Sequence, residues 1–173
     1  MKRFTRLACL VLGLGMGSLA HAQQGNTASI IGLMGRSLSQ SRKIEALIME
    51  VADGSPASFE DVKGPFEKAL AAHLRIARDL RSAFSLANTA PGYNASDPVS
   101  GLSANQVRAF EPNGFYYAAI NEHRNVNDLL VKLLTTYGQG LPEDQVAAYK
   151  ANLDLALAAV PLSNNFRGRP ESN

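Results

Sequence analysis

The stretch from Phe115 to Tyr137 constrains the fold most strongly, because apolar residues recur along it at three- and four-residue steps without an interrupting proline or glycine. This spacing puts them on one face of an α-helix and predicts a helix that buries that face. A histidine, His123, lies in the middle of the apolar stripe. The stripe comprises Tyr116, Ile120, His123, Val126, Leu130, Leu134 and Tyr137.

A second helix of the same form is predicted from Ser58 onward. Ser58 and Asp61 make a capping pattern, and Pro65 then predicts a kink or a restart of the helix. From Phe66 the apolar stripe is regular, and it also carries a histidine, His73. These two apolar stripes therefore each place one histidine toward the core.

Two more helices complete the set of long segments. The first runs from a cap at Thr27 or Ser29 to about Asp53, with Gly54 as its stop. The last begins at Pro142 and ends before Pro161. No stretch of the chain alternates in the way that a half-buried strand requires.

The connections between these helices differ in length. Residues 54–57 and 138–141 are short, which favours antiparallel neighbours. Residues 88–102 form a long loop with two prolines and two glycines, and a capping box at Ser103 starts a short helix that ends before Pro112. Asn113 is expected to cap the helix that follows. The sequence thus predicts an all-α, up-down antiparallel four-helix bundle, with a long loop and a short extra helix between helices 2 and 3.

The first 22 residues have the pattern of an export signal. Lys2, Arg3 and Arg6 precede a short apolar run, and Ala20-His21-Ala22 forms a small-x-small cleavage site. We expect a periplasmic or secreted protein cleaved near Ala22, with one bundle domain over residues 23–161, a flexible tail over residues 162–173 and no transmembrane anchor.

Removal of this signal changes the charge of the chain. Loss of Lys2, Arg3 and Arg6 lowers the 17 basic residues to 14 against 15 acidic ones, so the formal net charge moves from +2 to −1. The sequence therefore gives no indication of nucleic acid as a partner. The only cysteine, Cys9, lies inside the signal. Disulfide bonds, thiol catalysis and covalent attachment of haem are thereby excluded for the mature chain.

His73 and His123 are the candidate cofactor ligands. If their helices are neighbours, the two imidazoles fall at similar depth, where helical bundles hold haem or metal ions. Met34 on the first helix is a weaker third candidate because it lies near that helix's start. The alternative is that each histidine packs as a neutral ring and finds a hydrogen bond to Tyr116, Asn127 or a backbone carbonyl.

The layout resembles the small periplasmic haem-binding bundles of the b-type and c-prime cytochromes in export, length and helix count. The ligand motifs differ. Residues 162–166 read Leu-Ser-Asn-Asn-Phe where the c-prime family has Cys-x-x-Cys-His, and the last helix has no histidine. No ligand is carried over from those families. A transition metal or haem held by the two histidines is an alternative function, and the leading expectation involves no cofactor.

The leading expectation is a binding or accessory protein whose partner is another exported or envelope protein, or a small ligand. A homodimer is compatible with the sequence. The candidate contact residues are a tyrosine in the long loop and the polar side of the Phe115–Tyr137 helix, namely Tyr93, Asn121, Glu122, Arg124, Asn125 and Asp128. Arg75, Arg78 and Arg81 form a basic stripe on the second helix. No nucleophile elbow, phosphate loop or paired general-acid motif is present, so we expect no enzymatic activity.

Overall fold

The computed structural model describes residues 29–89, 102 and 104–162. The predicted signal peptide, Tyr93 with most of its loop, and the predicted tail beyond Leu162 lie outside the described residues.

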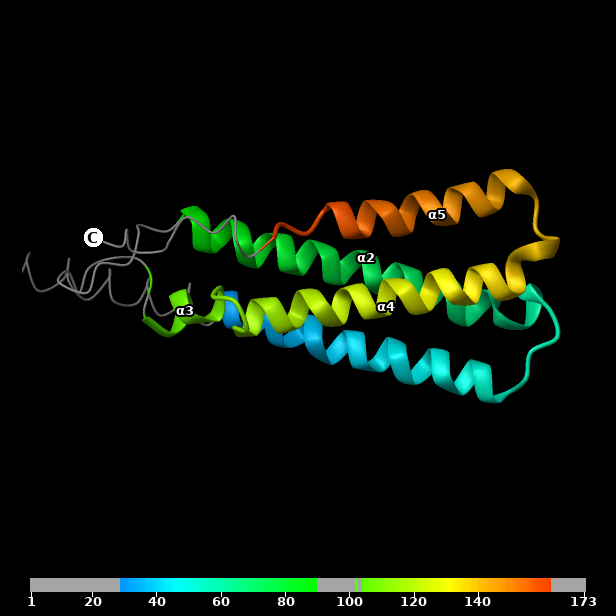
Figure 1. Cartoon of the computed structure of the whole chain (residues 1–173), viewed down its shortest axis with the longest axis horizontal. Coiled ribbons are helices and arrows are strands. Elements are labelled where there is room, and N and C mark those ends of the chain that lie inside the picture. Colours follow the sequence, from blue (N-terminus) through cyan, green and yellow to red (C-terminus); the bar gives the residue numbers. More distant parts are fainter. Residues whose placement is uncertain (1–28, 90–101, 103, 163–173) are drawn as a thin grey trace, which may run out of the picture.

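The described residues are helical apart from short connections, and they contain no strand. An N-terminal helix covers residues 29–53 and is followed by α2 (Phe59–Thr89), α3 (Ala104–Ala109), α4 (Phe115–Tyr137), the 3₁₀ turn η1 (Gly138–Gly140) and α5 (Glu143–Ala158). The long helices lie lengthwise beside one another (Figure 1). The all-α class and the bundle-like packing predicted from the sequence are confirmed. Within the described residues, no helix combines the length and the apolar character needed to cross a membrane.

Helices α2 and α4 form the centre of the bundle, and their contact is the most extensive between any two of the labelled helices. Phe84 of α2 packs on Tyr116 of α4, with ring centroids 5.7 Å apart. Helix α5 lies against both of them. Its Tyr149 ring packs edge-to-face with Phe66, with ring centroids 5.0 Å apart. The N-terminal helix covers another side of α2, where Arg36 pairs with Asp79 at 3.6 Å.

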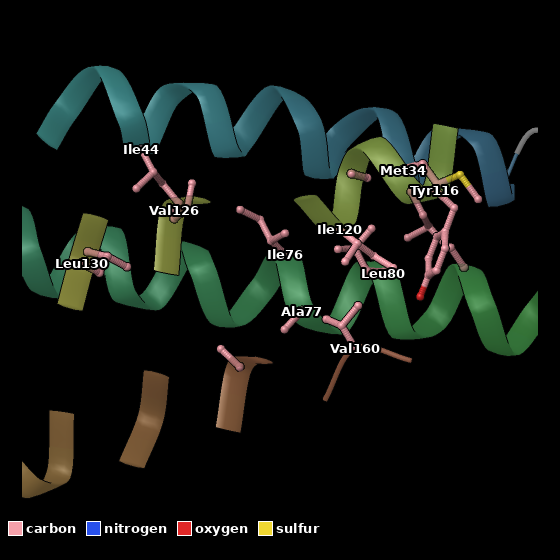
Figure 2. Packing of buried hydrophobic residues seen from close by; sticks show 14 of the residues in the cluster. Met34, Ile44, Ile76, Ala77, Leu80, Tyr116, Ile120, Val126, Leu130 and Val160 are labelled. Atoms are coloured by element: carbon pink, nitrogen blue, oxygen red, sulfur yellow. The ribbon is translucent and has the colours of Figure 1, made fainter. Parts of the chain in front are cut away.

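The buried side chains run along the whole length of the α2–α4 contact. Figure 2 shows Met34 and Tyr116 together at one end of the drawn core, with Ile44 and Val126 further along it. Tyr116, Ile120, Val126, Leu130 and Leu134 are all buried, as the stripe of this helix predicts. Burying each such side chain contributes roughly 1.5–3 kcal/mol before the entropy of ordering the chain is set against it.

Helix α2 begins at Phe59 and continues through Pro65 without ending. Of the two expectations for Pro65, the restart of the helix is therefore wrong. Pro65 lies in the second turn, where its missing N–H removes only one hydrogen bond near the helix start. The Asp61 carboxylate stabilises that start by accepting hydrogen bonds from the backbone N–H of Ala57 and of Ser58, at 3.0 and 2.9 Å.

The start of α4 differs from the prediction. Gly114, not Asn113, is the N-cap residue, and no side chain caps the first turn. Asn113 instead adopts a left-handed conformation with φ of 69°, which asparagine tolerates better than most residues. The Cβ of any residue at position 114 would lie 2.4 Å from the Arg108 carbonyl oxygen and 2.6 Å from that of Ala109. A glycine at this position therefore lets α3 fold back tightly onto α4.

Replacing Gly114 tests the close approach of α3 to the start of α4 directly. We expect Gly114→Ala to lower the free energy of unfolding by about 2 kcal/mol or more, because backbone atoms must move to admit the new methyl group. Urea unfolding followed by circular dichroism measures the change. Gly140→Ala is the matched control, since a Cβ there meets nothing within 4 Å. Equal stability of the two variants would contradict this account of the contact between α3 and Gly114.

Candidate functional site

The two histidines predicted on facing stripes meet in the core. The rings of His73 on α2 and His123 on α4 are stacked, with centroids 4.1 Å apart and planes inclined by 23°. The two residues are almost completely buried, with exposures of 0% and 1%. Their helical stripes placed them toward the core, but the depth at which α2 and α4 align is what brings the rings together.

Each ring donates one hydrogen bond that fixes its tautomer. His73 Nε2 lies 3.1 Å from the side-chain oxygen of Asn127, and His123 Nε2 lies 3.1 Å from the carbonyl oxygen of Ala156 on α5. Both oxygens only accept hydrogen bonds, so the proton of each neutral ring is on Nε2. Each Nδ1 keeps its lone pair, and neither has a hydrogen-bond partner among the described residues.

Burial keeps the two rings neutral. Desolvation lowers the pKa of His73 from 6.5 to about 3, helped by the neighbouring His123 and opposed by the hydrogen bond to Asn127. Desolvation also lowers the pKa of His123, and the charge of Arg124 adds to this effect. Two imidazolium ions at this separation would repel each other in a poorly solvated core. Both rings are therefore neutral at pH 7, each with an Nε2–H donor and an Nδ1 acceptor.

A hydroxyl group lies at a similar depth in the bundle. Ser41 of the N-terminal helix is fully buried, and its Oγ has no hydrogen-bond partner among the described residues. Two contacts on either side of Ser41 in the sequence give the register of the N-terminal helix against α2. Arg36 pairs with Asp79, and Ile44 lines the same surface hollow as Ala72. This antiparallel register puts Ser41 level with the part of α2 that carries His73. Met34 is two helical turns nearer the start of the helix, at the Tyr116 end of the core.

The geometry of the pair also tests the haem alternative. In bis-histidine ligation the iron lies between the two rings at about 2 Å from each nitrogen, which separates the ring centroids by roughly 6 Å. Here the rings face each other at 4.1 Å. Haem binding between His73 and His123 would require the two rings to separate, and it stays a prediction of the sequence.

The polar residues predicted as a contact surface on α4 face three directions. Asn125 and Asp128 are exposed and Asn121 is half-buried on the outer side of the helix. Glu122 turns toward the N-terminal helix, where desolvation, together with the charge of Glu122 and its hydrogen bond, raises the pKa of Glu45. Arg124 turns toward α5 and lines a cavity there. Only Asn121, Asn125 and Asp128 form a continuous outward face.

A hollow between the N-terminal helix and α2 was not predicted from the sequence. It has a volume of about 510 Å³, and small or apolar side chains form its floor: Ile44, Ala46, Leu47, Ala69 and Ala72. Lys43, Lys68 and Arg75 line its rim, with Glu50 at one end. Arg75 thus separates from the other members of the predicted basic stripe, because Arg78 and Arg81 belong to the exposed face of α2 outside the hollow.

Some of these features had a signal in the sequence and others had none. Asn127 lies one turn after His123 and was a recognisable partner for a core histidine. Ala156 acts through its backbone oxygen, which sequence does not reveal. The alanines of the hollow have no distinguishing pattern in the sequence, and only the alignment of the two helices shows that they line one hollow.

No family model, no curated protein and no solved structure matches the chain.

The neutral histidine pair predicts an acid-sensitive bundle. Between pH 6.5 and about 3, unfolded chains bind a proton that folded His73 does not, so the free energy of unfolding falls as the pH is lowered through this window. Each histidine contributes a slope of at most about 1.4 kcal/mol per pH unit.

Urea unfolding between pH 7 and 5 measures that slope. We expect His73→Gln to have a shallower slope than wild type, whatever its absolute stability. A wild-type slope near zero, or a ring pKa near 6.5 by NMR, would contradict burial of neutral rings.

Proposed function

We propose that the chain is an exported helical-bundle binding protein, and that the hollow between the N-terminal helix and α2 receives an acidic, amphipathic segment of another exported protein. The observation that carries the proposal is the combination of an apolar floor with three basic residues around it. The signal-like first 22 residues support export to the periplasm or beyond. The order and packing of the long helices support an up-down arrangement of the bundle.

The chemistry of the hollow favours a helix as the ligand. Amphipathic helices commonly bind by laying an apolar face into a groove between two helices. Ala46, Ala69 and Ala72 are small enough to let a partner backbone come close to the bundle surface. Carboxylates on the edges of such a helix would face Lys43, Lys68 and Arg75, which gives orientation and a faster, salt-dependent association.

Charge reversal at the rim tests this proposal. We expect Lys43→Glu/Lys68→Glu/Arg75→Glu to weaken binding of the partner by at least about tenfold, because three attractions become repulsions. The partner would be recovered by cross-linking in the exporting cell, purified, and titrated against each variant at two salt concentrations. Arg81→Glu/Lys132→Glu/Lys150→Glu is the matched control, because it reverses three exposed basic residues that lie outside the hollow.

Two outcomes contradict the proposal: equal binding by the rim variant and the control, or binding that does not weaken with salt. Asn125→Ala/Asp128→Ala tests the outer face of α4 in the same assay. Loss of binding in that variant alone would move the contact surface to α4.

A second candidate function is transition-metal binding by His73 and His123. The observation that favours it is the tautomer of each ring: Nε2–H is held by an oxygen, and Nδ1 is left with a lone pair. Metal-bound histidines typically have this arrangement, in which the second nitrogen donates to a carbonyl or carboxylate. Imidazole ligands suit Zn²⁺, Cu²⁺ or Ni²⁺. Within the described residues no cluster of three histidine, cysteine, aspartate or glutamate side chains accompanies them. The stacked rings would have to turn for both Nδ1 lone pairs to point at one ion.

Titration with Co²⁺, a spectroscopic substitute for Zn²⁺, tests this second function. We expect visible absorption bands that saturate at one ion per chain and disappear in His73→Gln and in His123→Gln. A saturating ion would also stabilise the folded chain, by about 2.7 kcal/mol at one hundred times the dissociation constant. Asp128→Asn, an exposed change on α4, should leave the spectrum unaltered. Absence of saturable bands in the wild type would reject the metal site.

A further inference from the structure

The turn between α3 and α4 contains a chemically reactive pair of residues. Asn113 is the only asparagine of the chain that is followed by glycine. It is exposed, and its φ is 69°. The Gly114 N–H donates a hydrogen bond of 2.8 Å to the carbonyl oxygen of Glu111. With Pro112 as its second residue and a positive φ at its third, residues 111–114 form a type II turn.

Asparagine followed by glycine is prone to deamidation, because glycine has no side chain to shield its backbone nitrogen. Once hydroxide removes the N–H proton, the Gly114 nitrogen attacks Cγ of Asn113. The N–Cγ bond forms, the Cγ–Nδ2 bond breaks, and ammonia leaves with a proton taken from water. The resulting succinimide then adds one water molecule. Opening of its ring at Cγ gives aspartate, and opening at the main-chain carbonyl gives isoaspartate.

The closed turn protects Asn113 from this reaction. Ring closure requires rotation about the Cα–C bond of Asn113, so that the Gly114 nitrogen reaches Cγ. This rotation breaks the hydrogen bond to Glu111 and displaces Gly114, whose carbonyl oxygen accepts a hydrogen bond of 3.0 Å from Ala118 N–H. Because α3 has only six residues, the turn can open by local separation of α3 from α4 while the long helices stay folded.

The isoaspartyl product does not fit the closed turn. Its main chain passes through Cβ and Cγ and is one methylene group longer. An added Cβ at Gly114 would already lie 2.6 Å from the Ala109 carbonyl oxygen, so the displaced backbone has no room beside α3. Phe110 packs on Tyr116 with ring centroids 4.7 Å apart and is 1% exposed. This packing is lost when α3 cannot return to α4.

We propose that Asn113 is a site of spontaneous deamidation, that opening of the turn at residues 111–114 controls the rate, and that the isoaspartyl product keeps α3 detached from α4. Deamidation would then convert a reversible opening at this end of the bundle into a permanent one. The site shares no residue with the hollow of the proposed function or with the histidine pair.

Ageing of the full chain at mildly alkaline pH, in buffer and in urea, tests the modification and its control by the turn. Mass spectrometry of proteolytic peptides measures the conversion of Asn113. We expect conversion in both samples, with a rate in buffer about ten- to a hundredfold lower because only the opened turn reacts. Equal rates in buffer and urea would overturn the proposal, as would absence of conversion at Asn113 in buffer over that range.

Two variants distinguish opening of the turn from unfolding of the whole bundle. Phe110→Ala loosens α3, whereas Phe59→Ala removes a buried ring that packs on Tyr149 at 5.8 Å, far from α3. We expect Phe110→Ala to raise the rate in buffer at least about threefold more than Phe59→Ala, since only the first variant weakens the local contact. An equal effect of both variants would show that global unfolding controls the reaction and would overturn the proposal.

The effect of the product is tested with the isoaspartyl chain, separated from aged protein by ion exchange. Asn113→Asp is the matched control, because it carries the same new charge without the additional methylene group. We expect a lower urea midpoint for the isoaspartyl chain than for Asn113→Asp, together with a weaker near-ultraviolet circular dichroism signal from the displaced aromatic rings. Equal midpoints would contradict detachment of α3 by the product.

Discussion

The contact of α2 with α4 around His73 and His123 is the interaction on which the rest of the bundle depends. It fixes the depth at which the two central helices align, and α5 joins the same layer because the Ala156 carbonyl accepts the His123 Nε2–H. Buried polar groups that lack partners are unfavourable by about 1–3 kcal/mol each. Hydrogen bonds to Asn127 and Ala156 satisfy one nitrogen of each ring. Because these bonds join α2 to α4 and α4 to α5, they favour one register among the three helices.

The same alignment creates the hollow beside α2 and the smaller cavity beside α4. Where the N-terminal helix runs beside α2, alanines from both helices meet and leave a hollow with a basic rim. Where α5 ends at Ala158 beside α4, a smaller cavity of about 170 Å³ lies next to His123, and Leu157 and Val160 are among its lining residues. The bundle thus has an open hollow beside α2 and a smaller, partly open cavity beside α4.

Helical periodicity was informative because it follows from local geometry. It located α4 at Phe115–Tyr137, put Tyr116, Ile120 and Val126 in the core, and assigned both histidines to buried faces. It was less informative at helix ends, where close backbone contacts decide the conformation. Gly114 replaces Asn113 as the cap of α4 because α3 folds back within reach of a Cβ, and that approach has no counterpart in the pattern of apolar residues.

The sequence by itself determined that the described chain is helical and that His73 and His123 face inward, because each of these properties repeats with the period of a single helix. Only the tertiary structure decided that the two rings stack, that Arg124 and His123 line one cavity, and that Arg75 belongs to a different surface from Arg78 and Arg81. These facts depend on the rotation and axial register of one helix against another. Side chains far apart in the sequence set that register together, so no single stretch of the chain encodes it.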